Sequence, residues 1–223
     1  MTVLTIASSK GGPGKTTVAE IIAASSAGHL RLVVLDADPT QAFTRWAANT
    51  YEGAAFETHA EPDETRLAHL IAAKAEEADL VLVDTAGFGN RAASVAMTSA
   101  DGVLIPAGAG EADITEAEKT VRLVEGLARA ARREIPARVL FNRVKRTSLA
   151  RHAAAEITRA GLLRLDAELA DRVTYGELGF NGRLPSSGPA LAEIEALLTE
   201  LRTLGWLPRR RHVTSSARKG AKA

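Results

Sequence analysis

The chain has 223 residues, of which 46% are hydrophobic, and its formal net charge is +1 at pH 7. This length suits one domain with a sizeable buried core. The sequence contains no Cys, which excludes disulfides and thiolate metal sites and is typical of a reducing compartment. Its first residues lack a signal-peptide pattern, and no run approaches the roughly 18 apolar residues of a membrane-spanning helix. We therefore expect a cytoplasmic protein with no membrane partner.

The small net charge conceals an asymmetry between the two parts of the chain. Residues 1–130 contain 10 Lys/Arg and 18 Asp/Glu, a net charge of −8, whereas residues 131–223 contain 18 Lys/Arg and 9 Asp/Glu, a net charge of +9. Such an imbalance is typical of a surface that binds a polyanion. Arg-rich helices with solvated faces would give the same numbers, so charge alone leaves both interpretations open.

Short apolar runs alternate with longer helical segments along the chain. The runs are continuous rather than alternating, which predicts buried strands at 2–7, 31–37, 79–86, 101–107 and 137–144. Helical spacing predicts helices at 15–27, 63–77, 89–99, 113–133, 148–161 and 189–204. This order predicts an α/β fold with a mostly parallel sheet and helices on both faces. Active residues should then lie at the carboxyl ends of the strands.

The last third of the chain is less regular. Residues 174–189, rich in Gly, Pro and Ser, are predicted to form a long connection, and connections of this length are usually functional or mobile. The final residues are basic and nearly devoid of large apolar side chains, so they cannot fold alone. We expect one domain over residues 1–205 and a flexible basic tail over residues 206–223.

A glycine-rich segment, SSKGGPGKTT at residues 8–17, joins the first predicted strand directly to the first predicted helix. Glycines in such a turn let backbone N–H groups form a nest for phosphate oxygens, and the helix N-terminus adds its positive end. Lys15 would reach the β- and γ-phosphates of a nucleotide, and the Thr16 hydroxyl would ligate Mg²⁺. The segment therefore predicts a phosphate-binding loop, or P-loop.

The fit is to a variant of the P-loop pattern. The strict form, G-x-x-x-x-G-K-[ST], requires Gly at position 9, where this chain has Ser9. The sequence matches K-G-G-x-G-K-T-T instead, a pattern that opens on a second lysine, Lys10. The residues predicted to bind the nucleotide in this loop are Gly11, Gly12, Pro13, Gly14, Lys15, Thr16 and Thr17.

Aspartates follow two further predicted strands. Asp36 and Asp38 come after the strand at 31–37, and Asp84 lies near the end of the strand at 79–86. An aspartate at a strand end beside the loop fits the carboxylate that organises Mg²⁺ in P-loop enzymes. We expect Thr16, Asp36 and Asp84 to form the metal site. Gly87 would offer its backbone N–H to the γ-phosphate, which makes 84–91 a predicted switch segment.

With these residues the sequence resembles the ParA/MinD family of P-loop ATPases, which carry the deviant Walker A motif. It looks most like the small ParA-type plasmid partition ATPases. The resemblance covers roughly residues 1–205 and is most specific at Lys10–Thr17. It implies ATP and Mg²⁺ as cofactors, ATP hydrolysis to ADP and phosphate, and an ATP-dependent homodimer in which each subunit faces the nucleotide of the other.

The resemblance also implies roles for individual residues. Lys10 matches the signature lysine that reaches across the dimer to the phosphates of the other subunit. A cation supplied in this way stabilises the charge that develops during phosphoryl transfer, so Lys10 and Lys15 are both predicted catalytic residues. Asp36 matches the DxDP element and would orient the attacking water. Asp84 matches the Walker B aspartate, and Asn142 matches an asparagine that contacts adenine.

Further matches concern the dimer interface. Pro106 and Asp113 are the anchors of a segment that resembles the family's P-x-x-x-x-x-D element near that interface. The stretch 171–185 resembles a late loop near the base and the interface, and it carries no predicted catalytic role.

Family membership of this kind implies a DNA partition (segregation) ATPase. The ATP-bound dimer would bind nonspecific DNA, associate with the nucleoid, and be released when a small centromere-binding adaptor protein stimulates hydrolysis. Nonspecific binding depends on phosphate contacts from Lys and Arg. Two candidate clusters supply them: the first is Arg143, Lys145, Arg146 and Arg151, and the second is Arg202, Arg209, Arg210 and Arg211.

Other functions remain open on the sequence. A family cousin would position protein clusters or assist DNA transfer. A metabolic P-loop enzyme, such as an ATP-dependent carboxylase or ligase, would show fast substrate-dependent turnover and no effect of DNA. A non-enzymatic DNA-binding module is disfavoured, because it has no use for Lys15, Thr16 and the strand-end aspartates together.

Overall fold

The computed structural model describes residues 1–87, 89–145 and 148–209. Within these residues one sheet contains seven strands: β1 (Thr2–Ile6), β2 (Leu32–Asp36), β3 (Glu57–Ala60), β4 (Leu80–Asp84), β5 (Gly102–Ala107), β6 (Ala137–Val144) and β7 (Arg164–Ala170). The helices are α1 (Lys15–Ser26), α2 (Ala42–Asn49), α3 (Glu64–Glu77), α4 (Arg91–Ser99), α5 (Glu111–Ala131), α6 (Ser148–Arg159), α7 (Val173–Asn181) and α8 (Gly188–Thr203). The predicted α/β fold is confirmed.

The strand order is β3-β2-β4-β1-β5-β6-β7, and every neighbouring pair is parallel. β1 lies in the middle of the sheet, with β4 on one side and β5 on the other. Ile6 of β1 is in register with Asp84 of β4, and Asp84 is in register with Asp36 of β2. The carboxyl ends of these three strands therefore meet at one edge, where a parallel sheet places its ligand site.

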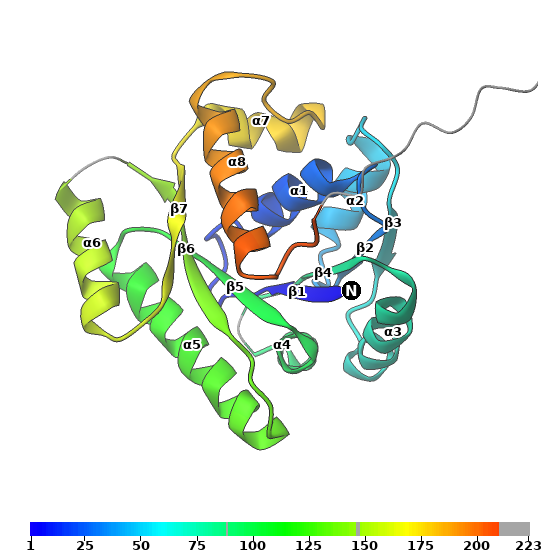
Figure 1. The fold of residues 1–223 in the computed structure, drawn as a ribbon, viewed down its shortest axis with the longest axis horizontal. Helices are drawn as coiled ribbons and strands as arrows, with labels where there is room; N and C mark the ends of the chain where they lie inside the picture. The colour runs from blue at the N-terminus through cyan, green and yellow to red at the C-terminus, as the bar shows by residue number, and fades with distance from the viewer. Residues whose placement is uncertain (88, 146–147, 210–223) are drawn as a thin grey trace, which may run out of the picture.

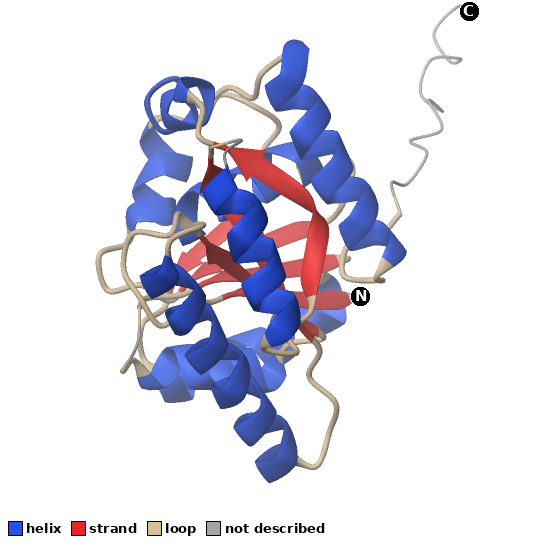
Figure 2. Cartoon of the chain, turned by 90° about the vertical axis from the view of Figure 1, so that its left-hand side faces the viewer, coloured by secondary structure: helices blue, strands red, loops and turns tan. Residues whose placement is uncertain are grey.

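The helices form one layer on each face of the sheet (Figures 1 and 2). One core cluster joins the sheet to α1, α2, α7 and α8 and includes Phe43, Trp46 and Leu197. Two further clusters join the opposite face to α3, α4, α5 and α6. Strands buried on both faces must be apolar throughout, which explains the continuous runs of Leu, Val and Ile in the sequence.

The edge strand β7 is protected by two glutamates of α8. The carboxylate of Glu200 accepts hydrogen bonds from the backbone N–H groups of Asp166 and Ala167, at 2.9 and 2.7 Å. Glu193 accepts one from Ala170 N at 3.1 Å. These contacts occupy backbone donors that an open edge strand would offer to another chain. The sheet therefore ends at β7 because α8 covers it.

The structure corrects four features of the sequence analysis. Residues 174–189 do not form one long connection, because α7 occupies 173–181, where Tyr175 and Leu178 are buried against the core. Three further elements, α2, β3 and β7, were also not predicted. The domain boundary at 205 stays a prediction, and Trp206 and Leu207 just beyond it belong to the core. Residues 210–223 of the predicted tail lie outside the described residues.

Candidate functional site: a P-loop with two lysines

The loop between β1 and α1 has the backbone conformation that a phosphate nest requires. Gly12 and Gly14 have φ angles of +96° and +88°, a region that L side chains rarely adopt. Gly14 is also the N-cap of α1, and no side chain caps that helix end. The first N–H groups of α1 therefore remain available to an anion, with the helix dipole in its favour.

Lys15 lies inside this loop. The residue is 7% exposed, and its Nζ donates a hydrogen bond to the backbone oxygen of Lys10 at 3.1 Å. Burial lowers the pKa of Lys15, while the nearby carboxylates of Asp84 and Asp38 oppose that change. A buried cation that faces a nest of N–H groups is suited to binding phosphate oxygens.

Thr16 and Asp84 meet as expected for a metal site. The Thr16 hydroxyl donates a hydrogen bond to Asp84 Oδ2 at 2.8 Å. Asp84 Oδ1 is buried and has no hydrogen-bond partner in the described part of the chain. Burial raises the pKa of Asp84 to about 8. A hydroxyl beside a buried carboxylate oxygen without a partner is a donor set that fits Mg²⁺, which prefers oxygen ligands.

Asp36 and Asp38 occupy different environments. Asp36 is fully buried, and its two carboxylate oxygens accept hydrogen bonds from the backbone N–H groups of Asp38 (3.2 Å) and Thr44 (2.9 Å). Burial raises the pKa of Asp36. Asp38 is only partly buried, and its Oδ1 accepts a hydrogen bond from the backbone N–H of Thr40 at 2.8 Å. Its negative charge favours the protonated form of Lys15 and so acts to raise the pKa of that lysine. Asp36 therefore holds the segment that follows β2, and Asp38 is the more open of the two carboxylates.

Asn142, at the end of β6, fixes the outer side of the P-loop. Its Nδ2 donates a hydrogen bond to the Pro13 oxygen at 2.7 Å, and a Cβ at position 14 would lie 2.3 Å from that nitrogen. The neighbouring Arg143 has a φ of +57° and donates to the Gly12 oxygen at 3.3 Å. A backbone conformation this rare for a non-glycine residue persists where its surroundings hold it, which is common at functional sites. Glycine at position 14 is thus required twice, by its own φ and by Asn142.

Lys10, in contrast to Lys15, lies at the surface. Its side chain is 49% exposed, and its Nζ lies 3.2 Å from Asp113 Oδ1 on α5. Lys10, Asp113, Asn142 and Arg143 line a pocket of about 480 Å³ beside the P-loop. The structure therefore brings together the predicted signature lysine, the predicted adenine contact and one predicted interface anchor. The other anchor, Pro106, is buried within β5, beyond the part of that strand that pairs with β1.

The predicted switch segment touches the P-loop directly. A Cβ at Gly87 would lie 3.5 Å from the backbone nitrogen of Gly11, an ordinary van der Waals distance, so the two segments are neighbours. Asn90 then caps α4, because its Oδ1 accepts a hydrogen bond from Ala92 N at 2.8 Å. The segment therefore connects the P-loop to the start of a helix.

The predicted basic clusters are only partly described. Lys145 lies 3.8 Å from Asp171, Arg143 contacts the P-loop, and Arg202 is partly buried. The side chains of Arg146, Arg151, Arg210 and Arg211 lie outside the described residues. The sequence analysis did not single out Arg129 and Arg132 at the end of α5, which are exposed and have no ion pair among the described residues.

The parallel sheet and a P-loop that contains a second lysine define a P-loop ATPase of the ParA/MinD class. Comparison with known proteins supports this class. A family model described as VirC1 protein matches residues 1–203, and the chain therefore belongs to the VirC1 family. Protein ParA of Rhizobium radiobacter is 29% identical over 191 residues, which cover 83% of this chain and 86% of that protein. Protein virC1 of Rhizobium rhizogenes is 33% identical over 150 residues, 65% of each chain.

Solved structures show the same fold. An aspartate-to-alanine variant of Cyanothece McdA in complex with ATP aligns with a TM-score of 0.78 at 18% identity, covering 95% of this chain and 99% of that one. A plasmid partition protein of Borrelia burgdorferi B31 bound to AMPPNP aligns with a TM-score of 0.70 at 17% identity, covering 91% and 98%. In the described part of this chain, no helix is long and apolar enough to cross a membrane.

Proposed function

We propose that this protein is an ATP-dependent DNA partition ATPase that acts as a nucleotide-controlled homodimer. The observation that carries the proposal is the contrast between its two P-loop lysines. Lys15 is buried within its own loop, whereas Lys10 is half exposed and forms an ion pair with Asp113 at the surface. Exposed pairs are weak, so Lys10 can leave Asp113 at small cost. Lys15 then serves the nucleotide of its own chain, and Lys10 serves the nucleotide of a second copy.

The remaining site residues have complementary roles in this proposal. Bound ATP and Mg²⁺ supply the phosphoryl group and the metal charge. The Thr16 hydroxyl and the Asp84 carboxylate hold the metal, and Asp36 contributes by fixing the segment that follows β2. The N–H groups around Gly11, Gly12 and Gly14 bind phosphate oxygens, with Thr17 in the first turn of α1. Asn142, which holds the Pro13 oxygen of the loop, would contact the adenine.

The proposal extends to partners and place of action. The basic residues 131–223 support binding of nonspecific DNA by phosphate contacts, and Arg132, with Arg129 just before that part of the chain, is exposed and could contribute such contacts. An ATP-bound dimer on DNA would be released when a small centromere-binding adaptor stimulates hydrolysis. The protein would then act in the cytoplasm, in association with the nucleoid.

The deciding experiment is binding to a random-sequence DNA duplex, measured by fluorescence anisotropy with ATP, with ADP and without nucleotide. We expect tight binding with ATP only, because the dimer doubles the number of phosphate contacts. The affinity should fall steeply with salt, by roughly 10³-fold or more between 50 and 200 mM for about six contacts. Binding that ignores the nucleotide would overturn the proposal and favour a metabolic enzyme or a protein that positions protein clusters.

The two aspartates after β2 are expected to respond differently to substitution. Asp36→Asn removes an acceptor from a buried backbone N–H group, so unfolding should become easier by about 1–3 kcal/mol and ATP turnover should fall as well. We propose that Asp38, the more open of the two carboxylates, positions the attacking water in place of Asp36. Asp38→Asn should then leave the melting temperature unchanged and lower turnover by roughly 10²-fold, the typical contribution of such a group. Thermal melts and steady-state ATPase assays measure both. Undiminished turnover in Asp38→Asn, with full stability and lost turnover in Asp36→Asn, would assign the water to Asp36 instead.

A further inference from the structure

Ser9, the residue that departs from the strict P-loop pattern, joins the loop to α5. Its backbone N–H donates a hydrogen bond to Thr120 Oγ1 at 3.0 Å. Its hydroxyl lies 2.6 Å from Glu116 Oε2 and 2.8 Å from the Glu116 backbone oxygen. The Thr120 hydroxyl donates to that same backbone oxygen at 2.8 Å. We call Ser9, Glu116 and Thr120 the Ser9 clamp.

The clamp and the ion pair of Lys10 use the same face of one helix. Asp113, Glu116 and Thr120 are three and four residues apart, the spacing that places side chains on one helix face. α5 thus holds two consecutive P-loop residues, Ser9 through the clamp and Lys10 through Asp113. Thr120 is 2% exposed, so the clamp has a buried anchor, whereas the Lys10 pair lies at the surface.

The carboxylate of Glu116 contacts two partners, Lys119 and Ser9, and its charge also interacts with that of Lys10. Its Oε1 lies 2.7 Å from Lys119 Nζ, which leaves Oε2 to accept from Ser9. The lysine and then the Ser9 hydroxyl lower the pKa of Glu116, so the carboxylate is ionised at neutral pH. A hydrogen bond to an ionised acceptor is stronger than one between neutral groups. The Ser9 side chain is therefore firmly held.

The contacts of Lys15 show how a nucleotide would act on this arrangement. Lys15 Nζ donates to the backbone oxygen of Lys10, the residue next to the clamp. A phosphate group in the nest competes for Lys15 Nζ and releases that oxygen. Because Ser9 is fixed on α5, the backbone movement that follows is limited to Lys10 and changes its ion pair with Asp113.

We propose that Glu116 and Thr120 are positioning residues that act through Ser9. They transmit the structural effect of ATP binding from the P-loop to Lys10 and α5. This inference rests on the proposed ATP-dependent dimer. Without the clamp, Ser9 would move together with the rest of the P-loop when ATP binds. Lys10 would then keep its pair with Asp113 and would not become available to a second copy. The clamp is thus required for coupling between nucleotide binding and dimerisation, and it is not required for nucleotide binding.

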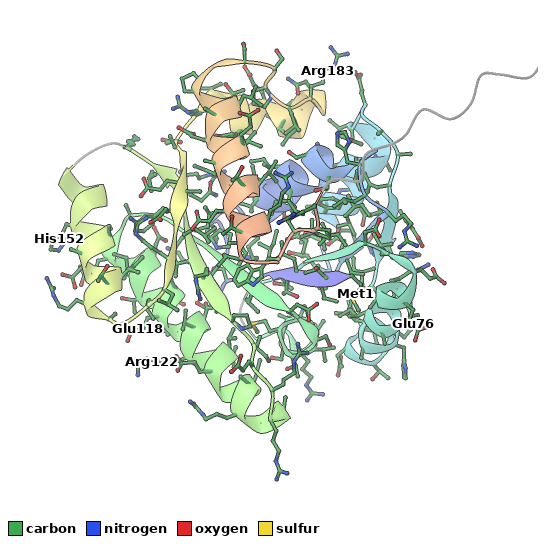
Figure 3. All side chains as sticks on the ribbon, viewed as in Figure 1. Met1, Glu76, Glu118, Arg122, His152 and Arg183 are labelled. Carbon is green, nitrogen blue, oxygen red and sulfur yellow. The ribbon has the colours of Figure 1, made fainter. Side chains whose placement is uncertain are left out.

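The test uses a matched pair of variants at Thr120. Thr120→Val keeps the shape but removes the acceptor of the Ser9 N–H group, whereas Thr120→Ser keeps the hydroxyl. Glu116→Ala provides a second disruption in case Thr120→Val does not fold. Glu118→Ala is its control, because Glu118 pairs with Arg122 on α5 (Figure 3), and no hydrogen bond joins Glu118 to Ser9 in the described part of the chain. ATP affinity is measured on dilute monomer, and dimerisation by sedimentation with ATP.

We expect Thr120→Val and Glu116→Ala to bind ATP within about two-fold of the wild type and to dimerise roughly ten-fold more weakly. Thr120→Ser and Glu118→Ala should match the wild type. Equal dimerisation in all variants would overturn the proposal. So would equal losses of ATP affinity and dimerisation, because the clamp would then only shape the binding loop.

Amide hydrogen exchange on dilute monomer separates this inference from the proposed function. Addition of ATP should change the exchange of residues 113–120 in the wild type and in Thr120→Ser, and should not change it in Thr120→Val. A wild type that remains monomeric with ATP overturns the proposed function, and the clamp is then judged by exchange alone. The same response in both Thr120 variants overturns the clamp.

Discussion

Replacing Lys15 by alanine is expected to abolish ATP binding, with a loss of affinity of at least about 100-fold. Lys15 is the buried cation of the phosphate nest, whereas the second lysine of the loop, Lys10, is half exposed and pairs with Asp113. A charge-assisted hydrogen bond to a phosphate contributes about 1.5–3 kcal/mol, and contacts to two phosphates give roughly 3–5 kcal/mol. That free energy corresponds to a change of about 10²–10⁴-fold in the dissociation constant. Titration with a fluorescent ATP analogue measures it.

The folded state should tolerate the Lys15 substitution. The hydrogen bond that Lys15 makes to Lys10 is lost, but a partly desolvated charge is removed with it, as the lowered pKa of Lys15 indicates. The melting temperature without nucleotide should therefore stay close to that of the wild type, whereas stabilisation by ATP should disappear. Lys74→Ala is a suitable control, since Lys74 lies on α3 and pairs with Glu57. Full ATP affinity in Lys74→Ala would show that the loss is specific to Lys15. Wild-type ATP affinity in Lys15→Ala would contradict the proposed phosphate site.

The buried strands were predictable because a parallel sheet covered on both faces leaves little choice of residue. The runs around β1, β2, β4, β5 and β6 are apolar on both sides and stand out in the sequence. β3 is short and only partly buried, with the sequence ETHA, and it carries no such signal. β7 alternates buried Leu165, Ala167 and Leu169 with polar residues, the pattern of an edge strand. β7 therefore contains no continuous apolar run of the kind that marks the buried strands.

α7 was missed for a different reason. It contains Gly176 and Gly179, which lower helix propensity and favour a loop in any local interpretation. The helix forms because Tyr175 and Leu178 are buried, and because the Leu178 backbone oxygen accepts a hydrogen bond from Trp46 Nε1 at 2.9 Å. Trp46 is 132 residues away in the sequence. Tertiary contacts of this kind override local propensity and cannot be derived from the segment itself.

The sequence predicts which strand ends and residues form the site, but it does not predict the contacts between their side chains. Thr16 and Asp84 meet because parallel strands end at one edge, which the motif and the strand order already imply. The different burial of Asp36 and Asp38 depends on how the chain turns after β2. The sequence therefore did not predict which carboxylate is the more open one, and the sequence analysis gave the water-orienting role to Asp36. Contacts of the P-loop with α5 join residues more than 100 positions apart. They required the folded chain.

Replacing Lys10 by alanine is expected to leave ATP binding by the monomer within about two-fold of the wild type and to abolish ATP-dependent dimerisation and turnover. Lys10 Nζ points away from the nest to Asp113, so its removal takes no cation from the chain's own nucleotide. A cation supplied in trans stabilises the charge of the transferring phosphoryl group, and such residues contribute about 10³–10⁵-fold to turnover. Sedimentation with ATP and an ATPase assay measure the two losses.

The control for Lys10 is its own partner, because Lys10→Ala also removes the ion pair with Asp113. Asp113→Asn removes the same pair and retains the lysine. If the pair matters only as a surface contact, its loss costs no more than about 1 kcal/mol, and Asp113→Asn should still dimerise with ATP. Dimerisation retained in Asp113→Asn and lost in Lys10→Ala would place the effect on the lysine and on its reach to a second copy. A Lys10→Ala variant that fails to bind ATP as a monomer would show instead that both lysines bind one nucleotide. The contrasting burial of Lys10 and Lys15 would then no longer support a dimer.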